Sequence, residues 1–212
     1  MITEQEKRVE LKLVLATRNK DKIKEIEHAL TGLDVELLTL DQFPQAPEVE
    51  EDGTTLAENA LKKARTIFDV THILTMADDT GLEVDFLNGE PGIYSSRFAG
   101  EGASYDDNCN KLLELMKAVP KEQRTARFRC VVAFVGPGIE RLVEGTCEGF
   151  ITSEKRGSHG FGYDPIFYVP QYAQTFAEMP LELKNKISHR GVALQQAKRV
   201  LQQMLKEGSL QT

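Results

Sequence analysis

The chain has 212 residues, of which 41% are hydrophobic and 28% are charged, and its formal net charge is −7. This composition is typical of a soluble globular protein with a substantial core, and no apolar run approaches the roughly 18 residues that a membrane-spanning helix needs. The negative charge argues against a general nucleic-acid-binding protein, because such proteins normally present a basic face.

Residues 1–10 predict a polar N-terminal extension, because the stretch is charged and lacks the apolar core of a signal peptide. We expect a single domain over residues 11–212. The cysteines, Cys109, Cys130 and Cys147, have no spacing typical of a metal site. We interpret them as reduced, packed thiols, which indicates a cytoplasmic protein.

The first predicted unit is a strand, a polar loop and a helix. Residues 11–16 are mostly apolar and favour a buried strand, and the apolar residues of 23–30 recur at helical spacing. The free N–H groups at the start of such a helix can face an anion, and the lysines of loop 17–22 add positive charge. Thr17 and Asn19 could cap the helix. A capped helix with solvated lysines explains the same residues without a ligand.

An acidic run at residues 48–53 stands directly before a second predicted helix, residues 55–68. Such runs usually form a solvated surface. Glu51 and Glu58 are nevertheless candidate metal ligands, because hard cations prefer carboxylate oxygens. For Glu58, capping is the simpler explanation, since Thr55 and Glu58 have the spacing of a capping box.

An apolar run at residues 73–77 ends in two adjacent carboxylates, Asp78 and Asp79, and then in Thr80 and Gly81. We predict a short buried strand that stops at the pair, where ligands of open α/β sheets usually bind. Adjacent residues of an extended chain point to opposite sides, so one carboxylate can face a metal or a water while the other is held by backbone donors. A polar turn is the simpler explanation of an isolated Asp-Asp pair.

The second half of the chain predicts a helix, a hairpin and a glycine-rich loop. The helix is indicated from residue 104 to about 117, and the β-rich runs 126–135 and 140–151 predict the hairpin. The loop 152–165 has glycines on both sides of Phe161, and glycine lets a backbone approach a ligand closely. We therefore expect this loop to present an aromatic ring to a ligand.

The last predicted helix covers about residues 192–206, and Ser188 is a plausible cap for it. This cap would place His189 and Arg190 in the first helical turn. Cations are disfavoured at that end of the helix dipole. We therefore expect an anionic or electron-rich group to compensate them, and the local conflict indicates a functional site.

Six motifs follow one another in a fixed order. They are Thr17-x-Asn19-x-x-Lys22, Glu50-Glu51-x-Gly53, Asp78-Asp79-Thr80-Gly81-Leu82, Gly160-Phe161-Gly162-Tyr163-Asp164-Pro165, Lys184, and Ser188-His189-Arg190-Gly191. In this order and spacing the chain resembles the inosine triphosphate pyrophosphatase family over about residues 11–206. The resemblance implies an elongated, two-lobed, mixed-sheet α/β fold, an active site in the cleft between the lobes, and a homodimer. It also implies Mg²⁺-dependent hydrolysis of ITP, dITP and XTP to the monophosphate and pyrophosphate.

The resemblance extends to individual residues. It implies catalytic roles for Asp79, Lys22 and Lys184, and metal binding by Asp79 and Glu51. Two positions depart from the family's pattern: Thr80 stands where serine is commoner, and Arg18 occupies a variable position that is often small. The implied substrate-binding residues are Thr17, Arg18, Asn19, Lys20, Asp21, Lys22, Thr80, Phe161, Gly162, Tyr163, Asp164, Lys184, His189 and Arg190.

The chemistry of these residues fits the hydrolysis of a nucleoside triphosphate. Lys22 and the N–H groups of the first helix would hold phosphates, and Asp79 and Glu51 would bind Mg²⁺. Asp79 is expected to orient or deprotonate a water, and Lys184 to neutralise the leaving pyrophosphate. The sequence leaves open which carboxylate is the base and which is mainly a ligand.

A purine of the hypoxanthine or xanthine type would find complementary groups in the predicted pocket. Arg190 or His189 would donate to O6, Asp164 would accept from N1–H, and Phe161 would stack on the ring. Adenine presents the reverse pattern at both positions, so ATP is expected to be a very poor substrate. The alternative is that Phe161 and Tyr163 belong to the core and that Asp164 only caps a turn.

Two other functions remain as alternatives. A house-cleaning pyrophosphatase of the Maf type would share much of the chemistry, but the Phe161 loop and the Ser188-His189-Arg190 motif argue against it. A nucleotide-binding regulator without hydrolysis would need no acids, so Asp79 and Glu51 argue against that function.

Overall fold

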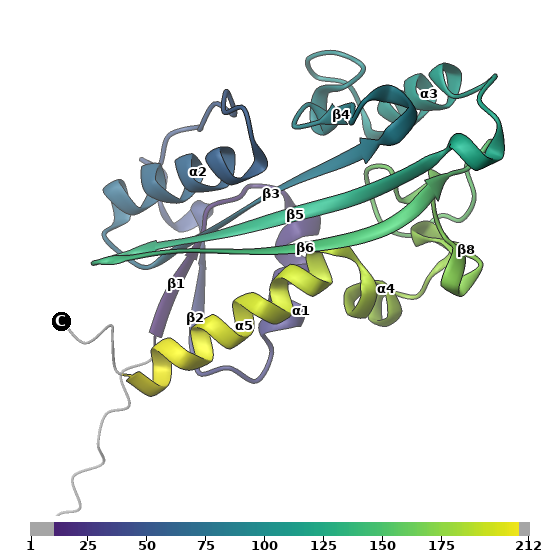
Figure 1. Cartoon of the computed structure of the whole chain (residues 1–212). Helices are drawn as coiled ribbons and strands as arrows, with labels where there is room; N and C mark the ends of the chain where they lie inside the picture. Colours follow the sequence, from purple (N-terminus) through teal and green to yellow (C-terminus); the bar gives the residue numbers. More distant parts are fainter. Residues whose placement is uncertain (1–10, 208–212) are drawn as a thin grey trace, which may run out of the picture.

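A computed structural model describes residues 11–207 of the protein (Figure 1). The predicted extension at residues 1–10 lies outside the described residues. The strands are β1 (Leu11–Leu15), β2 (Val35–Thr39), β3 (Thr75–Val84), β4 (Pro91–Gly92), β5 (Thr125–Gly136), β6 (Ile139–Ile151), β7 (Phe167–Val169) and β8 (Gln174–Thr175). The α-helices are α1 (Lys20–Leu30), α2 (Leu56–Thr71), α3 (Tyr105–Leu115), α4 (Leu181–Ile187) and α5 (His189–Glu207).

One mixed sheet connects the described strands, in the order β2-β1-β3-β5-β6-β7-β8, with β4 paired to β3. β1 runs parallel to β2 and to the beginning of β3, whereas β3, β5, β6, β7 and β8 pair antiparallel along the sheet. The predicted hairpin is the long pair of β5 and β6. The α/β class with a mixed sheet is therefore confirmed.

β3 is longer than the sequence predicted. The expectation that it stops at Asp78 and Asp79 is wrong, because the strand covers Thr75–Val84 and β5 pairs with it along this whole length. β1, by contrast, pairs with β3 only as far as Met76, and β4 joins at Leu82. Between these two points no described strand pairs with this edge of β3, and the aspartate pair lies on that stretch.

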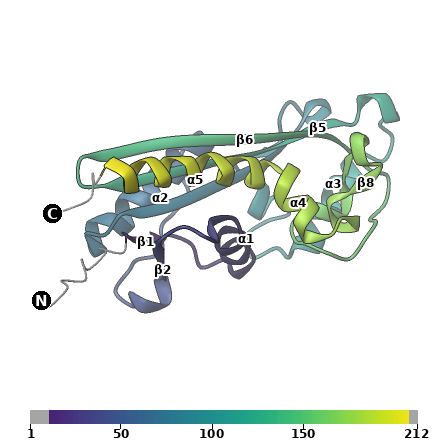
Figure 2. The ribbon, with the colours of Figure 1, turned by 90° about the horizontal axis from the view of Figure 1, so that it is seen from below.

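The residues of β3 point alternately to the two faces of the sheet, and each face has its own helices. Met76 belongs to a core that α1 and α5 close, and Ala77 belongs to a core that α2 closes. Figures 1 and 2 show α2 on one side of the sheet and α1 and α5 on the other. Asp78 has the direction of Met76 and Asp79 that of Ala77, so the two carboxylates point to opposite sides, as predicted. The expected backbone donors are wrong for Asp78, because the side chains of Lys22 and Arg190 hold its carboxylate.

A third core lies at the other end of the sheet. It joins the ends of β3, β5 and β6 to α3 and β7, and includes Leu112, Phe128 and Phe167. Figure 2 shows the elongated outline that results. The division into two lobes with a cleft between them stays a prediction, as does a single domain that extends over residues 11–212.

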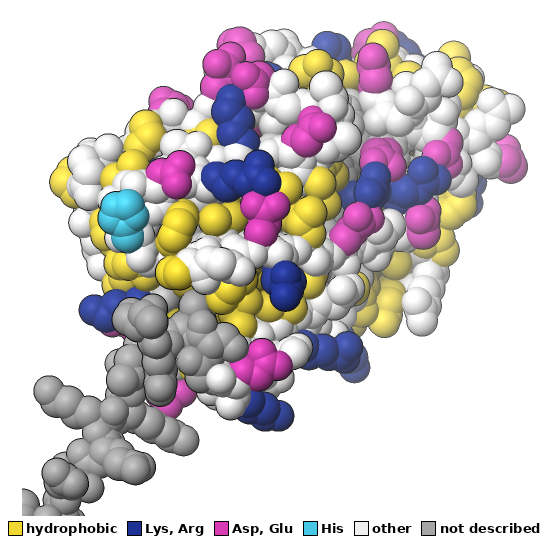
Figure 3. Space-filling model, turned by 60° about the vertical axis from the view of Figure 1, so that its left-hand side comes forward, with side chains coloured by type: hydrophobic (Ala, Val, Ile, Leu, Met, Phe, Trp, Pro, Cys, Tyr) yellow, Lys and Arg dark blue, Asp and Glu magenta, His cyan; other side chains and the backbone are white. Residues whose placement is uncertain are grey.

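The surface shown in Figure 3 mixes basic, acidic and hydrophobic side chains, and no single basic patch covers this face. A nucleic acid would find no extended basic surface there. Within residues 11–207, no helix is both long and apolar enough to cross a membrane.

Candidate active site

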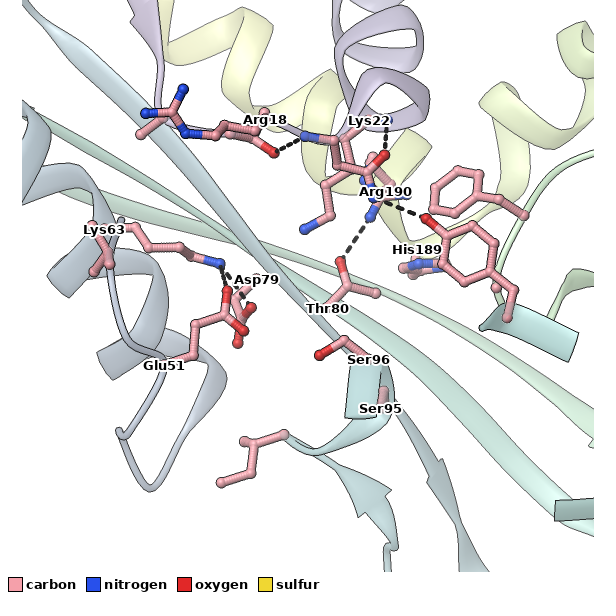
Figure 4. A pocket seen from close by; sticks show the side chains of 18 of the residues that line it. Arg18, Lys22, Glu51, Lys63, Asp79, Thr80, Ser95, Ser96, His189 and Arg190 are labelled. Atoms are coloured by element: carbon pink, nitrogen blue, oxygen red, sulfur yellow. Dashed lines mark hydrogen bonds and ion pairs between the residues drawn. The ribbon is translucent and has the colours of Figure 1, made fainter. Parts of the chain in front are cut away.

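A cavity of about 380 Å³ opens where β1 ends and β3 continues beyond it (Figure 4). All residues predicted to form the site line this cavity except Lys20 and Asp21. Lys20 is exposed, and the carboxylate of Asp21 lies 3.8 Å from the ammonium of Lys24. The structure therefore brings together most of the predicted site from distant parts of the sequence, but not these two side chains.

The loop after β1 holds the first turn of α1 at the cavity. Asn19 Oδ1 accepts hydrogen bonds from the N–H groups of Asp21 and Lys22, at 2.9 and 3.3 Å. Thr17 Oγ1 accepts one from the N–H of Asn19, at 3.2 Å. The predicted cap by Asn19 is therefore present, whereas Thr17 bonds the residue before the helix and does not cap it. The alternative that Lys22 is a solvated lysine is wrong, because its ammonium lies 3.1 Å from Asp78 Oδ2 and its side chain is only 16% exposed.

The two predicted metal ligands come from different elements and meet at one ammonium group. Glu51 belongs to the loop before α2, and Asp79 belongs to β3. Lys63 Nζ donates to Glu51 Oε1 at 2.6 Å and to Asp79 Oδ1 at 2.9 Å (Figure 4). It also donates to the main-chain oxygen of Asp78 at 2.7 Å. Glu58 does not reach this point, since it is exposed and accepts hydrogen bonds from the loop in front of α2.

The different environments of Asp79 and Glu51 shift the pKa values of the two carboxylates in opposite directions. Burial raises the pKa of Asp79, and the nearby charge of Glu51 raises it further, against the opposing effect of Lys63. Burial also acts on Glu51, but Lys63 and the other cations around it hold the pKa of Glu51 below its ordinary value. Asp79 is therefore the stronger base of the pair, and Glu51 is the carboxylate that stays ionised more readily.

Glu51 and Asp79 fit a hard cation such as Mg²⁺. Both carboxylates and the carbonyl of Asp78 reach within 2.9 Å of a single nitrogen atom, and such oxygens are the ligands that Mg²⁺ prefers. Among the side chains of residues 11–207, no group of three or more His, Cys, Asp or Glu could hold a metal ion. A magnesium ion here would complete its shell with water or with oxygens of a bound ligand.

Arg190 is buried in the first turn of α5, as predicted, and the protein's own carboxylates compensate it. Its Nε lies 3.2 Å from Asp78 Oδ2 and its Nη1 lies 2.8 Å from Glu25 Oε2. Its Nη2 donates to Thr80 Oγ1 at 3.0 Å (Figure 4). A guanidinium carries five N–H donors, so two of them remain beyond these three contacts.

His189 avoids the unfavourable charge at the helix N-terminus by remaining neutral. Burial, together with the nearby charges of Arg190 and Lys184, lowers the pKa of His189 well below its ordinary value. Its ring stacks on Phe128 with centroids 4.4 Å apart and an interplanar angle of 12°. A neutral imidazole in the cavity wall can donate or accept a hydrogen bond, depending on its tautomer.

The neutral state of His189 predicts a pH dependence of stability. The unfolded chain binds a proton on this residue below about pH 6.5, whereas the folded chain does not, so the free energy of unfolding falls as pH falls below that value. We expect His189→Asn to reduce this slope by up to about 1.4 kcal/mol per pH unit. Urea denaturation at several pH values between 7 and 5 measures how the free energy of unfolding changes with pH. His28→Asn, at an exposed position of α1, is the control, and an equal slope in wild type and His189→Asn would contradict the account.

Lys184 is buried against two carboxylates at the opposite end of the cavity from Lys63. Its ammonium lies 2.9 Å from Glu25 Oε1 and 2.6 Å from Asp164 Oδ2. It also lies 4.7 Å from the centre of the Phe161 ring. Lys184 therefore joins the glycine-rich loop to Glu25, and through Glu25 to Arg190.

The structure divides the predicted aromatic loop between core and cavity. Asp164 Oδ2 accepts from the N–H of Phe161 at 2.8 Å, so Asp164 caps its own loop, as the structural alternative held. Gly160 has φ +75°, and a Cβ there would lie 2.0 Å from Asp164 Oδ2, so this close turn requires glycine. Tyr163 is buried and donates to the carbonyl of Ser95 at 2.9 Å. Phe161 remains partly exposed and lines the cavity.

Three functional neighbours were not identified from the sequence. They are Glu25, Asn59, whose Nδ2 donates to Asp79 Oδ2 at 3.3 Å, and Lys63. Asn59 and Lys63 are four residues apart, on the face of α2 that is otherwise apolar and buried. Polar residues inside a predicted apolar stripe were the signal that could have revealed these two.

Comparisons with known proteins agree with the geometry. The model of the Ham1 family matches residues 13–200. A dITP/XTP pyrophosphatase from Desulforamulus reducens is 52% identical over 195 residues, which are 92% of this chain and 97% of that protein. A dITP/XTP pyrophosphatase from Geobacter sulfurreducens is 52% identical over 184 residues, 86% of this chain and 92% of that protein.

Solved structures give the same result. A HAM1 protein from Coxiella burnetii superposes with a TM-score of 0.85 at 41% identity, over 91% of this chain and 99% of that one. The Ham1 protein of Staphylococcus aureus gives a TM-score of 0.82 at 38% identity, over 90% of this chain and 98% of that one. The sequence resemblance is thus confirmed across nearly the whole described fold, and the chain belongs to the Ham1 family.

Proposed function

We propose that this protein hydrolyses the non-canonical purine nucleoside triphosphates dITP, ITP and XTP to the monophosphate and pyrophosphate, with Mg²⁺ as cofactor. The observation that carries the proposal is the division of one cavity into two chemically different ends. Lys63, Glu51 and Asp79 are bonded together at one end, and Phe161 lies at the other with the buried cations of α4 and α5. Lys22 lies between them, since its ammonium and the guanidinium of Arg190 both contact Asp78 Oδ2. The relatives named dITP/XTP pyrophosphatase support the same substrate class.

The first end is suited to a triphosphate. The first turn of α1 begins at this end, and the positive end of the helix dipole there favours an anion, although Asn19 already accepts from the N–H groups of Asp21 and Lys22. The ammonium groups of Lys22 and Lys63 add two positive charges, both within 3.5 Å of the main-chain oxygen of Asp78. A triphosphate that binds here gains electrostatic stabilisation although the protein as a whole is negatively charged.

The reaction needs a water that attacks the α-phosphorus as the bond to the bridging α–β oxygen breaks. Bound Mg²⁺ would neutralise phosphate charge and lower the pKa of a water at this end of the cavity. Asp79 accepts the proton of the attacking water, because its raised pKa makes it the stronger base of the two carboxylates. Before metal and nucleotide bind, Asn59 and Lys63 each hold one oxygen of this carboxylate.

The second end is suited to the base. Phe161 offers a ring face for stacking, while Arg190 and His189 offer N–H donors for O6. Asp164 Oδ2 is already shared by Lys184 and the N–H of Phe161, so the expected acceptor for N1–H would be the other oxygen of this carboxylate. We assign Lys184 to this end, where it positions the Phe161 loop rather than the pyrophosphate.

The remaining features of the proposal follow the family. The protein acts as a homodimer in the cytoplasm. The test is the release of pyrophosphate from dITP and XTP in the presence of Mg²⁺, with ATP and GTP as competing substrates.

A further inference from the structure

The ammonium of Lys63 lies among three oxygens. It donates to Glu51 Oε1, Asp79 Oδ1 and the carbonyl of Asp78, at 2.6, 2.9 and 2.7 Å. A lysine ammonium has three N–H donors, so all of them are used. The set of two carboxylate oxygens and one carbonyl oxygen is also the donor set that a hard divalent cation prefers.

The fold holds the Lys63 ammonium in this position. The side chain leaves the buried face of α2 and is 11% exposed. The carbonyl of Asp78 is available because no strand within residues 11–207 pairs with this edge of β3 between Met76 and Leu82. Burial disfavours the charged lysine, but the carboxylates of Asp79 and Glu51 outweigh this effect and raise the pKa of Lys63 above its ordinary value.

We propose that Lys63 is an internal counter-cation that competes with Mg²⁺ for Glu51 and Asp79, so that the metal binds tightly only together with a triphosphate. An ammonium and a divalent cation cannot both lie against the same two oxygens, because like charges a few ångströms apart repel strongly where water is scarce. A bound triphosphate supplies new anionic oxygens for the ammonium and thereby releases the carboxylates to the metal.

This arrangement couples two binding events. Metal and nucleotide each favour the state in which Lys63 has left the carboxylates, so each must strengthen the binding of the other. The coupling rests on the proposed function, since it requires a triphosphate ligand. The competition between Lys63 and Mg²⁺ for the two carboxylates exists without any nucleotide and can be tested separately.

The first test is isothermal titration of the nucleotide-free protein with Mg²⁺ at pH 8. We expect Lys63→Met to bind Mg²⁺ at least about tenfold more tightly than wild type, because the competing charge is removed. Lys62→Met is the matched control: the neighbouring Lys62 forms an exposed pair with Asp52 at 2.6 Å, so its loss removes the same charge outside the site. Lys63→Arg retains the cation and should bind Mg²⁺ as weakly as wild type.

Equal or weaker Mg²⁺ binding by Lys63→Met, or an equal gain in Lys62→Met, would overturn the proposal. Wild type provides a test that does not depend on the folding of the methionine variant. The NMR signal of the Lys63 ammonium, assigned by its absence in Lys63→Arg, should persist at millimolar Mg²⁺. It should shift when the α,β-methylene analogue of dITP is added with Mg²⁺.

A shift of this signal by micromolar Mg²⁺ alone would also overturn the proposal. The titration and the NMR measurement with Mg²⁺ alone use neither turnover nor nucleotide. Failure of the counter-cation proposal is therefore distinguishable from failure of the proposed hydrolysis, which would appear as absent pyrophosphate release from dITP.

Discussion

Asp79→Asn is expected to fold like wild type and to lose nearly all turnover of dITP, with kcat lower by about 10²–10⁴-fold. The substitution preserves the shape of the side chain but removes the group that accepts the water proton. Lys63 would still have Glu51 and the carbonyl of Asp78 as partners, so no buried charge is left alone. Steady-state kinetics at saturating Mg²⁺ and thermal unfolding of the same preparations measure the two effects.

Glu51→Gln is the comparison for this variant. Glu51 is more exposed than Asp79, with side-chain values of 26% and 7%, and its pKa stays below the ordinary value. Its loss should mainly raise the Mg²⁺ concentration needed for half-maximal rate. Near wild-type activity of Asp79→Asn at saturating Mg²⁺ would show that the base is another group.

Arg190→Lys is expected to lower the preference for ITP over ATP, measured as the ratio of their kcat/KM values, by about 10–100-fold. Lysine keeps the positive charge between Asp78 and Glu25 but lacks the planar fork of donors. The variant therefore keeps the charge that stabilises the two buried carboxylates but loses the hydrogen bonds to O6. The measurement is kcat/KM for ITP, XTP, ATP and GTP in wild type and variant.

Arg190→Ala would be a poor test of the same idea. It would leave the carboxylates of Asp78 and Glu25, whose side chains are 1% and 6% exposed, without their shared cation. Removing one partner of a buried ion pair costs about 3–5 kcal/mol, so lost folding would obscure lost specificity. Arg199→Lys, at an exposed position of the same helix, is the matched control. An ITP/ATP ratio that Arg190→Lys leaves unchanged would rule out Arg190 as a specificity determinant.

Features that depend on neighbouring residues could be predicted from the sequence. Asn19 caps α1 as expected, and Ser188 Oγ accepts from the N–H of Gly191 at 3.1 Å, so α5 begins where the cap placed it. The opposite directions of Asp78 and Asp79 follow from strand geometry alone. Local backbone chemistry determines each of these features, whatever the rest of the chain does.

Features that depend on distant partners could not be predicted. The continuation of β3 past the aspartate pair results from its pairing with β5, a contact that no local pattern near Asp79 reveals. The partial burial of Lys22 and the full burial of Lys184 likewise depend on their carboxylate partners, Asp78 and Glu25, which lie on other elements. A single sequence gives the charge of such residues, but their pairing is decided by the fold.

The most direct test of the proposed function is a chromatographic assay of wild-type protein with Mg²⁺ and dITP, XTP, ATP or GTP. We expect dITP and XTP to give the nucleoside monophosphate and pyrophosphate in equal amounts, and ATP to have a kcat/KM lower by at least about 10²-fold. Equal hydrolysis of ATP and dITP, or release of orthophosphate and a nucleoside diphosphate, would contradict the proposed function.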